Sequence, residues 1–181
     1  MEIFWRKGYE KTSVVELLAA TGLHKGSLYQ AFGDKHSLFI LALQRYISNL
    51  KQEMSQVMTD APSGIEGIRE ALYRHIDRGC TGDGSNSGCM ALNTLVEKGK
   101  EDADVFAVLQ DAFGNRMKMV TESVARAQAE GDIRADMPAQ RIAMIIITLV
   151  AGLAAGLRGA VDTEQSRVVV DDVLLTLRPG T

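Results

Sequence analysis

Proline and cysteine are scarce in this sequence. Three prolines occur among 181 residues, at positions 62, 138 and 179, and each stands where a helical pattern starts or has just ended. Long uninterrupted helices are therefore allowed. Two cysteines without a signal-peptide pattern argue against a secreted disulfide scaffold, and we expect a cytoplasmic protein.

Long apolar runs are also few. The longest, IAMIIITLVAGLAAGL from Ile142 to Leu157, is shorter than the roughly 20 residues that a membrane span needs. We interpret it as a buried helix and expect no membrane partner.

Patterns typical of enzymes and metal sites are missing. His24, His36 and His75 are far apart, no G-x-S-x-G motif occurs, and no carboxylate–histidine spacing indicates a metal. The loop TGDGSNSG at 81–88 does not have the spacing of a dinucleotide fingerprint. We expect no catalytic residue, no metal and no cofactor; an enzyme with Cys89 and His75 as a nucleophile pair is a remote alternative.

Charge is unevenly distributed along the chain. Residues 1–48 hold six lysines and arginines against four acids, a net charge of +2, whereas the whole chain carries −3 and the remainder therefore −5. A basic N-terminal part attached to an acidic body suggests that the first part, rather than the whole surface, binds a polyanion.

The hydrophobic pattern predicts helices throughout. Ser13 with Glu16 and Ser63 with Glu66 have the spacing of a capping box, in which hydroxyl and carboxylate each satisfy a backbone amide at a helix start. The segment RVVVDDVLLTL at 167–177 is the best strand candidate, but its apolar residues also recur at helical spacing. About nine helices are predicted, over 2–7, 13–21, 25–32, 34–59, 63–79, 88–99, 102–130, 137–160 and 164–177.

Two short predicted helices, 13–21 and 25–32, are joined around Gly22 and can pack through Leu17 and Leu28. This arrangement is typical of a helix-turn-helix, whose second helix enters the major groove of DNA. On the second helix Leu28 shares an apolar face with Phe32, while polar side chains point elsewhere. The alternatives are a helical hairpin in an ordinary core and a helical dimer that binds no DNA.

The segment GYEKTSVVELLAATGLHKGSLYQAFGDKHSLF at 8–39 resembles the DNA-binding half of the tetracycline-repressor (TetR) family. The later segment GDIRADMPAQRIAMIIITLVAGL is similar to the start of that family's eighth helix. The resemblance implies an all-α fold with a three-helix DNA-binding domain over 1–46 and a ligand-sensing and dimerisation domain over 47–181. It implies a repressor that dissociates from a palindromic double-stranded operator when a small-molecule inducer binds.

Functional residues follow from the same resemblance. Phosphate contacts fall on Thr12 or Ser13, Ser27, Tyr29 and Lys35, and base-facing positions on Lys25, Gly26 and Gln30. The first predicted helix is about two turns shorter than is usual in the family, and we expect a further N-terminal segment.

A homodimer is predicted from the apolar run. Gly152 and Gly156, four residues apart, leave a smooth surface on which another helix can pack closely. Packing within the chain is the alternative, but the resemblance favours pairing of helices 137–160 and 164–177 with their copies. The predicted dimer contacts are Ala151, Gly152, Ala155, Gly156, Val169 and Val173.

The inducer site is predicted in the helices at 63–79, 88–99 and 102–130, which supply an apolar lining with few polar groups. An alternative sensor is Cys89, because a thiol at a helix start has a lowered pKa and reacts with electrophiles and oxidants. A buried structural role for Cys89, or a disulfide with Cys80, also stays open. The candidate residues are Tyr73, His75, Cys89, Met90, Asn93, Phe106, Phe113, Arg116 and Met117.

Overall fold

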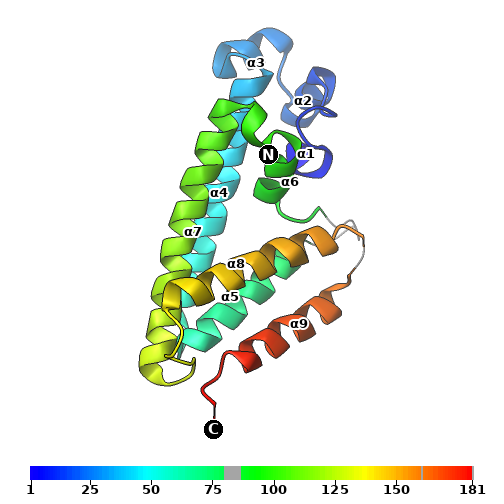
Figure 1. The fold of residues 1–181 in the computed structure, drawn as a ribbon. Coiled ribbons are helices and arrows are strands. Elements are labelled where there is room, and N and C mark those ends of the chain that lie inside the picture. Colours follow the sequence, from blue (N-terminus) through cyan, green and yellow to red (C-terminus); the bar gives the residue numbers. More distant parts are fainter. Residues whose placement is uncertain (80–86, 160, 181) are drawn as a thin grey trace. The chain divides into compact units, whose positions relative to one another are not determined.

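A computed structural model describes residues 1–79, 87–159 and 161–180, and over these residues the chain is all-helical, as predicted. Nine α-helices and one 3-10 helix occur in this part of the chain, without a strand (Figure 1). They are α1 (Glu2–Lys7), α2 (Val14–Thr21), α3 (Lys25–Phe32), α4 (Lys35–Asp60), α5 (Gly64–Gly79), α6 (Met90–Glu97), η1 (Gly99–Glu101), α7 (Ala103–Glu130), α8 (Ala139–Gly156) and α9 (Thr163–Thr176).

Two helices are shorter than their sequence pattern indicates. Helix α8 ends at Gly156 rather than near residue 160, and the amide of Val161 donates to the Gly156 carbonyl. The sixth ends at Glu97, since Gly99 adopts φ +40° and opens a 3-10 turn. The segment 167–177, the strand candidate, is helical from its start to Thr176.

The chain forms two compact units. The first comprises Met1–Asn49 and Cys89–Asp111, and the second Leu50–Gly88 and Ala112–Thr181. Helices α4 and α7 each contribute to both. The predicted functional boundary after residue 46 stays a prediction, and α6 belongs to the same compact unit as the N-terminal helices.

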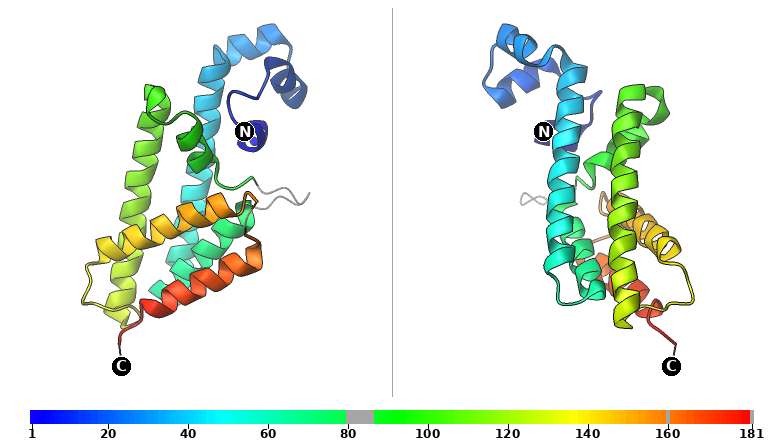
Figure 2. Two further views of the ribbon diagram at one scale, coloured as in Figure 1. Left: turned by 45° about the vertical axis from the view of Figure 1, so that its right-hand side comes forward. Right: turned by 90° about the vertical axis from the view of Figure 1, so that its left-hand side faces the viewer.

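The core of the second unit is formed by α5, α8 and α9 together with the part of α7 that belongs to this unit. Helix α5 packs against both α8 and α9 (Figure 2). Ile68, Ile142 and Val170, one from each of these three helices, are completely buried. Full burial of such a side chain stabilises the fold by roughly 1.5–3 kcal/mol.

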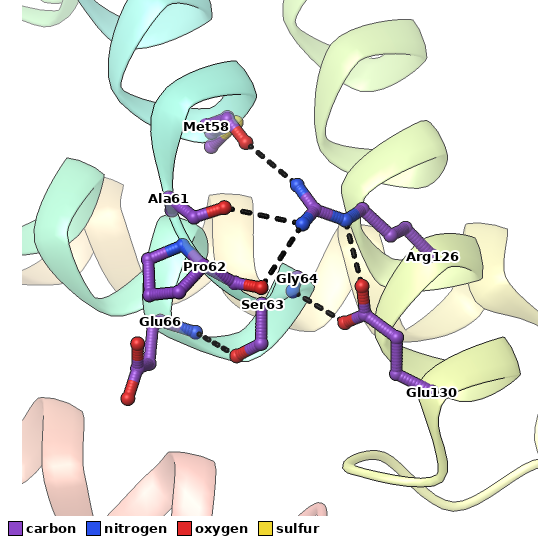
Figure 3. A network of polar contacts seen from close by, with 8 residues as sticks. All are labelled: Met58, Ala61, Pro62, Ser63, Gly64, Glu66, Arg126 and Glu130. Carbon is purple, nitrogen blue, oxygen red and sulfur yellow. Dashed lines mark hydrogen bonds and ion pairs between the residues drawn. The ribbon is translucent and has the colours of Figure 1, made fainter.

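Arg126 on α7 joins the end of α4 to the start of α5 (Figure 3). Its guanidinium donates to the carbonyl oxygens of Met58, Ala61 and Pro62 at 3.1–3.3 Å, which satisfies acceptors that a helix end leaves unpaired. It also pairs with Glu130, whose other carboxylate oxygen accepts from the Gly64 amide at 2.6 Å.

Helix α8 is long and apolar enough to cross a membrane, judged by length and composition only. Its mean hydropathy is 1.7 over 18 residues. Such a helix is weak evidence for a membrane span, since the core helix of a soluble protein passes the same test. Only 33% of it is buried within the chain.

Candidate nucleic-acid interface

The start of α2 is fixed by the predicted capping box. The Ser13 hydroxyl accepts from the Glu16 amide at 3.2 Å, and the Glu16 carboxylate accepts from the Ser13 amide at 2.8 Å. Hydrogen bonds from Lys7 and from Ser13 lower the pKa of Glu16 to about 2, so this carboxylate is ionised at neutral pH. Ser13 itself is exposed, which leaves it accessible to a partner.

The turn between α2 and α3 depends on Gly22. This residue has φ +68°, and its amide donates to the Leu18 carbonyl at 2.9 Å. The left-handed conformation is readily adopted only by glycine. The chain then enters α3 at Lys25, with His24 in an extended conformation before it.

An apolar and aromatic core holds these helices. Leu17 and Leu28 are 2% and 0% exposed, and Phe32 is half-buried. Phe39 of α4 packs edge-on against Phe4, with 5.1 Å between ring centroids, and its ring is tilted against that of Tyr9 at 5.0 Å. The first turn of α3 is therefore fixed in position by its buried face.

The outer face of α3 is polar. Tyr29 is half-buried, and the Lys25 amine lies 5.9 Å from the centre of its ring. The four other candidate positions on this helix are exposed: Lys25, Gly26, Ser27 and Gln30. We call these five residues the polar surface of α3. A Cβ added to Gly26 would meet no atom of its own chain within 4 Å, so this glycine is not required by packing.

Thr12 and Ser13, the two alternatives for one phosphate contact, differ sharply in exposure. Thr12 is completely buried, and its hydroxyl donates to the Gly8 carbonyl at 2.6 Å. Ser13 is exposed. The structure therefore favours Ser13 for contact with another molecule and gives Thr12 a role in holding the turn before α2.

Lys35, the first residue of α4, lies over the ring of Tyr9 at 4.3 Å from the centroid. Asp34 caps this helix by accepting from the Ser37 amide at 2.7 Å, and this hydrogen bond lowers the pKa of Asp34. A cation over an aromatic face is attracted by the ring. The Lys35 side chain is therefore held beside the turn at Tyr9.

Three residues between the end of α6 and the start of α7 also contact the N-terminal part of the chain, and sequence reasoning missed them. The Glu97 carboxylate accepts from the amides of Tyr9 and Glu10, each at 2.9 Å. Lys98 forms an ion pair with Glu10, which lowers the pKa of Glu10 and raises that of Lys98. These hydrogen bonds join residues that are separated by 87 or 88 positions in the chain. Such distant contacts leave no local pattern in a sequence.

Asp102, just before α7, makes the third of these contacts, with His36. Its Oδ2 lies 2.9 Å from Nε2 of the imidazole. Burial raises the pKa of Asp102, but the hydrogen bond from the Val105 amide and the contact with His36 lower it by more, and it lies below its ordinary value.

The candidate inducer-binding residues are divided between the two units. Tyr73 donates from its hydroxyl to Asp171 at 2.6 Å, so its polar end is directed to α9, and Phe113 is 47% exposed. The first unit contains Cys89, Met90, Asn93 and Phe106, and the second contains Tyr73, His75, Phe113, Arg116 and Met117. His75, Cys89 and Met90 are buried.

Cys89 is the N-cap residue of α6 and is 3% exposed. The Tyr46 hydroxyl donates to its sulfur at 3.6 Å. The thiol is thus packed inside the first unit. Its suggested disulfide partner, Cys80, lies outside the described residues.

The candidate dimer contacts also differ in exposure. On α8, Gly152 and Ala155 are exposed, and a Cβ at Gly152 would meet nothing within 4 Å, whereas a Cβ at Gly156 would lie 3.1 Å from Val161 of its own chain. Ala151 is half-buried.

On α9, Val169 is 40% exposed, while Val173 packs against the core. Large apolar side chains that the sequence did not single out are exposed on the two helices as well: Met144, Ile145, Val168 and Leu175.

Comparison with known proteins agrees with this geometry. The profile of the family described as "Bacterial regulatory proteins, tetR family" matches residues 1–42, and that of the "Tetracyclin repressor-like, C-terminal domain" matches residues 64–171. The transcriptional repressor ComR of Escherichia coli is 23% identical over 165 residues, covering 91% of this chain and 79% of ComR.

Two solved structures show the same fold. A cysteine-substituted TetR-family regulator CifR, in complex with a 26-base-pair operator DNA, is 28% identical and superimposes with a TM-score of 0.84, covering 97% of this chain and 91% of that one. The reduced form of NemR from Escherichia coli is 16% identical, with a TM-score of 0.80, and covers 94% and 90%. The predicted helix-turn-helix and the predicted family are thereby confirmed, and the chain belongs to the TetR family of DNA-binding transcriptional regulators.

Proposed function

We propose that this regulator is a repressor that binds a palindromic operator as a homodimer and releases it when a small molecule binds in the C-terminal half. The observation that carries the DNA-binding part is the exposed polar surface on a helix whose opposite face is completely buried at Leu28. Relatives named as repressors support the direction of regulation. A neighbour bound to operator DNA supports DNA as the target. Since the DNA is the target, we propose a cytoplasmic location.

Within the interface we assign two kinds of contact. Ser13, Ser27, Tyr29 and Lys35 bind phosphates, which orients the protein, and Lys25, Gly26 and Gln30 face the bases, which provides the sequence preference. The exposure of Ser13 and the fixed position of Lys35 over Tyr9 support the first assignment. The exposed N-terminal turn of α3 supports the second.

Two lysine variants test these assignments in one experiment. Lys35→Ala should weaken binding to all sequences alike and lower the salt slope by about one unit, because one phosphate contact is lost. Lys25→Ala should weaken the preferred operator most, by roughly 1–3 kcal/mol if a bidentate base contact is lost. The measurement is binding to a panel of operator variants at several salt concentrations, after selection of the preferred site from random DNA.

The two assignments fail separately. An unchanged salt slope in Lys35→Ala would contradict the proposed phosphate contact of Lys35. If Lys25→Ala ranks the operator panel as the parent does, Lys25 makes no base-specific contact.

Dimerisation is proposed through α8 and α9. The exposed apolar residues on these helices would be covered by a second copy, and a two-fold dimer presents two recognition helices to two half-sites. At Gly152 an added Cβ would meet nothing within 4 Å, so a partner helix can approach closely there.

The inducer is proposed to be a small, largely apolar molecule. The match of residues 64–171 to the tetracycline-repressor-like C-terminal domain supports an inducer site in this part of the chain. The second unit contributes Tyr73, His75, Phe113, Arg116 and Met117, which combine apolar surface with few polar groups.

A second candidate function is thiol sensing at Cys89. The N-cap position of Cys89 and its hydrogen bond from Tyr46 favour it, because oxidation would disturb both the start of α6 and α4. The solved neighbours include cysteine-substituted forms of one regulator and the reduced form of another. At 3% exposure, the sulfur is more accessible to a small oxidant than to a bulky electrophile.

The two functions are separated by treating operator complexes of the parent and of Cys89→Ser, with Cys80 present in both. For a thiol sensor we expect hydrogen peroxide to release the parent but not the variant, and a maleimide to act more slowly than peroxide. Equal release of both proteins, or no release of either, would reject Cys89 as the sensor.

A further inference from the structure

The Glu97 carboxylate binds the turn that precedes α2. Its two oxygens accept separately from the consecutive amides of Tyr9 and Glu10, at 2.9 Å each. Hydrogen bonds from backbone amides to an ionised carboxylate are among the stronger ones in proteins. This arrangement depends on Gly8, because a Cβ there would lie 2.7–3.0 Å from the same carboxylate and φ is +81°.

The turn that Glu97 binds leads directly into the proposed interface. Thr12, fully buried, closes it with a hydroxyl bond to the Gly8 carbonyl, and the next residue is Ser13, the N-cap of α2. Tyr9, in the same turn, carries the Lys35 amine over its ring. Two proposed phosphate contacts, Ser13 and Lys35, are therefore positioned from one short segment.

Further contacts hold the end of α6 in the same place. Lys98 pairs with Glu10 and lies 4.6 Å from the centre of the Tyr9 ring. Asp102 contacts His36, which packs edge-on against Tyr9 at 6.2 Å. The segment from Glu97 to Asp102 is thus tied to the Tyr9 turn at several points.

We propose that Glu97 is a positioning residue of the DNA-binding domain, which holds the Tyr9 turn so that Ser13 and Lys35 reach the phosphates. This inference rests on the proposed phosphate contacts. It gives α6, far from the helix-turn-helix in sequence, a direct part in DNA affinity.

The sign of the effect separates positioning from simple electrostatics. DNA is a polyanion, so removal of a negative charge beside the interface should strengthen binding if charge alone mattered. Positioning predicts the opposite. We expect Glu97→Ala to lower operator affinity about tenfold, because two charge-assisted hydrogen bonds are lost.

Glu101→Ala is the matched control. Glu101 lies in η1, four residues further on, is exposed, and has no side-chain hydrogen bond or ion pair among the described residues. The same loss of charge should there leave operator affinity unchanged or slightly higher. Glu97→Gln keeps one acceptor but presents an NH₂ group to the second amide. We expect this variant to lose about threefold in operator affinity.

Hydrogen exchange provides a readout that does not depend on DNA. The amides of Tyr9 and Glu10 should exchange faster in Glu97→Ala, while those of Leu17 and Leu28 keep their protection, which shows that the domain is still folded. Operator affinity equal to or higher than the parent's, a loss of the same size in Glu101→Ala, or unchanged exchange at Tyr9 and Glu10 would each overturn the proposal.

The proposed phosphate contacts are tested independently in the same assay. An unchanged salt slope in Lys35→Ala contradicts the Lys35 contact itself. A lowered slope in that variant together with full affinity in Glu97→Ala rejects the positioning role alone.

Discussion

Replacement of Gly152 by leucine is expected to convert a dimer into a monomer and to weaken operator binding about a hundredfold or more. A Cβ at this position would have no atom of another part of its own chain within 4 Å, so the added side chain starts in open space, and we expect the leucine to collide with a partner helix. Loss of the dimer removes the avidity gained when two linked recognition helices bind one operator, which is commonly 10²–10⁴-fold.

The measurement is sedimentation at micromolar concentration, paired with operator binding. Gly114→Leu on α7 is the matched control, since Gly114 is also exposed, helical and open within 4 Å, and both variants replace glycine by a better helix former. A monomeric parent, or a Gly152→Leu protein that remains dimeric with full affinity, would contradict the proposed interface. Gly156 is a poorer test because its neighbour Val161 would be displaced first.

The features that could be predicted from the sequence are those determined by a few neighbouring residues. The start of α2 follows from Ser13 and Glu16, three positions apart, and the turn after it from Gly22. The polar surface of α3 follows from the spacing of Leu28 and Phe32 on the opposite face. Each of these signals lies within one or two helical turns, so no knowledge of tertiary packing is needed.

The outward face of α9 could not be predicted in the same way. Its apolar residues are too closely spaced for periodicity to select one stripe. In the structure Val170 and Leu174 are buried, while Val168 and Leu175 are 54% and 62% exposed. Packing against α5 decides between the faces, and that contact joins distant parts of the chain.

Thr12 shows a related limit. A threonine hydroxyl can donate to a phosphate or to a backbone carbonyl of its own chain, and the residue type does not distinguish the two. Here the Gly8 carbonyl is four residues away and the side chain is completely buried. The contribution of Glu97 was beyond prediction for a stronger reason, because its partners are backbone amides, which every sequence contains.

The second large effect is expected from Gly26→Ala, which should stabilise the protein and yet impair its function. Gly26 is the second residue of α3, and a Cβ there would meet nothing within 4 Å. Alanine in a helix is favoured over glycine by about 0.5–1 kcal/mol. The free energy of unfolding should therefore stay the same or rise by up to that amount.

Operator affinity should fall about tenfold or more in the same variant, because a methyl group would occupy the space into which the DNA must come if Gly26 faces the bases. A thermal or urea melt and operator binding on one preparation provide the two measurements. Gly114→Ala, a helical glycine equally open to solvent on α7, is expected to gain stability without losing affinity. Because nothing in the chain itself opposes the added methyl group, a loss of affinity in a stable Gly26→Ala protein points to the approach of the DNA. Full operator affinity in Gly26→Ala would instead contradict the assignment of Gly26 to the base-facing positions. Lys25 and Gln30 would then provide the sequence preference.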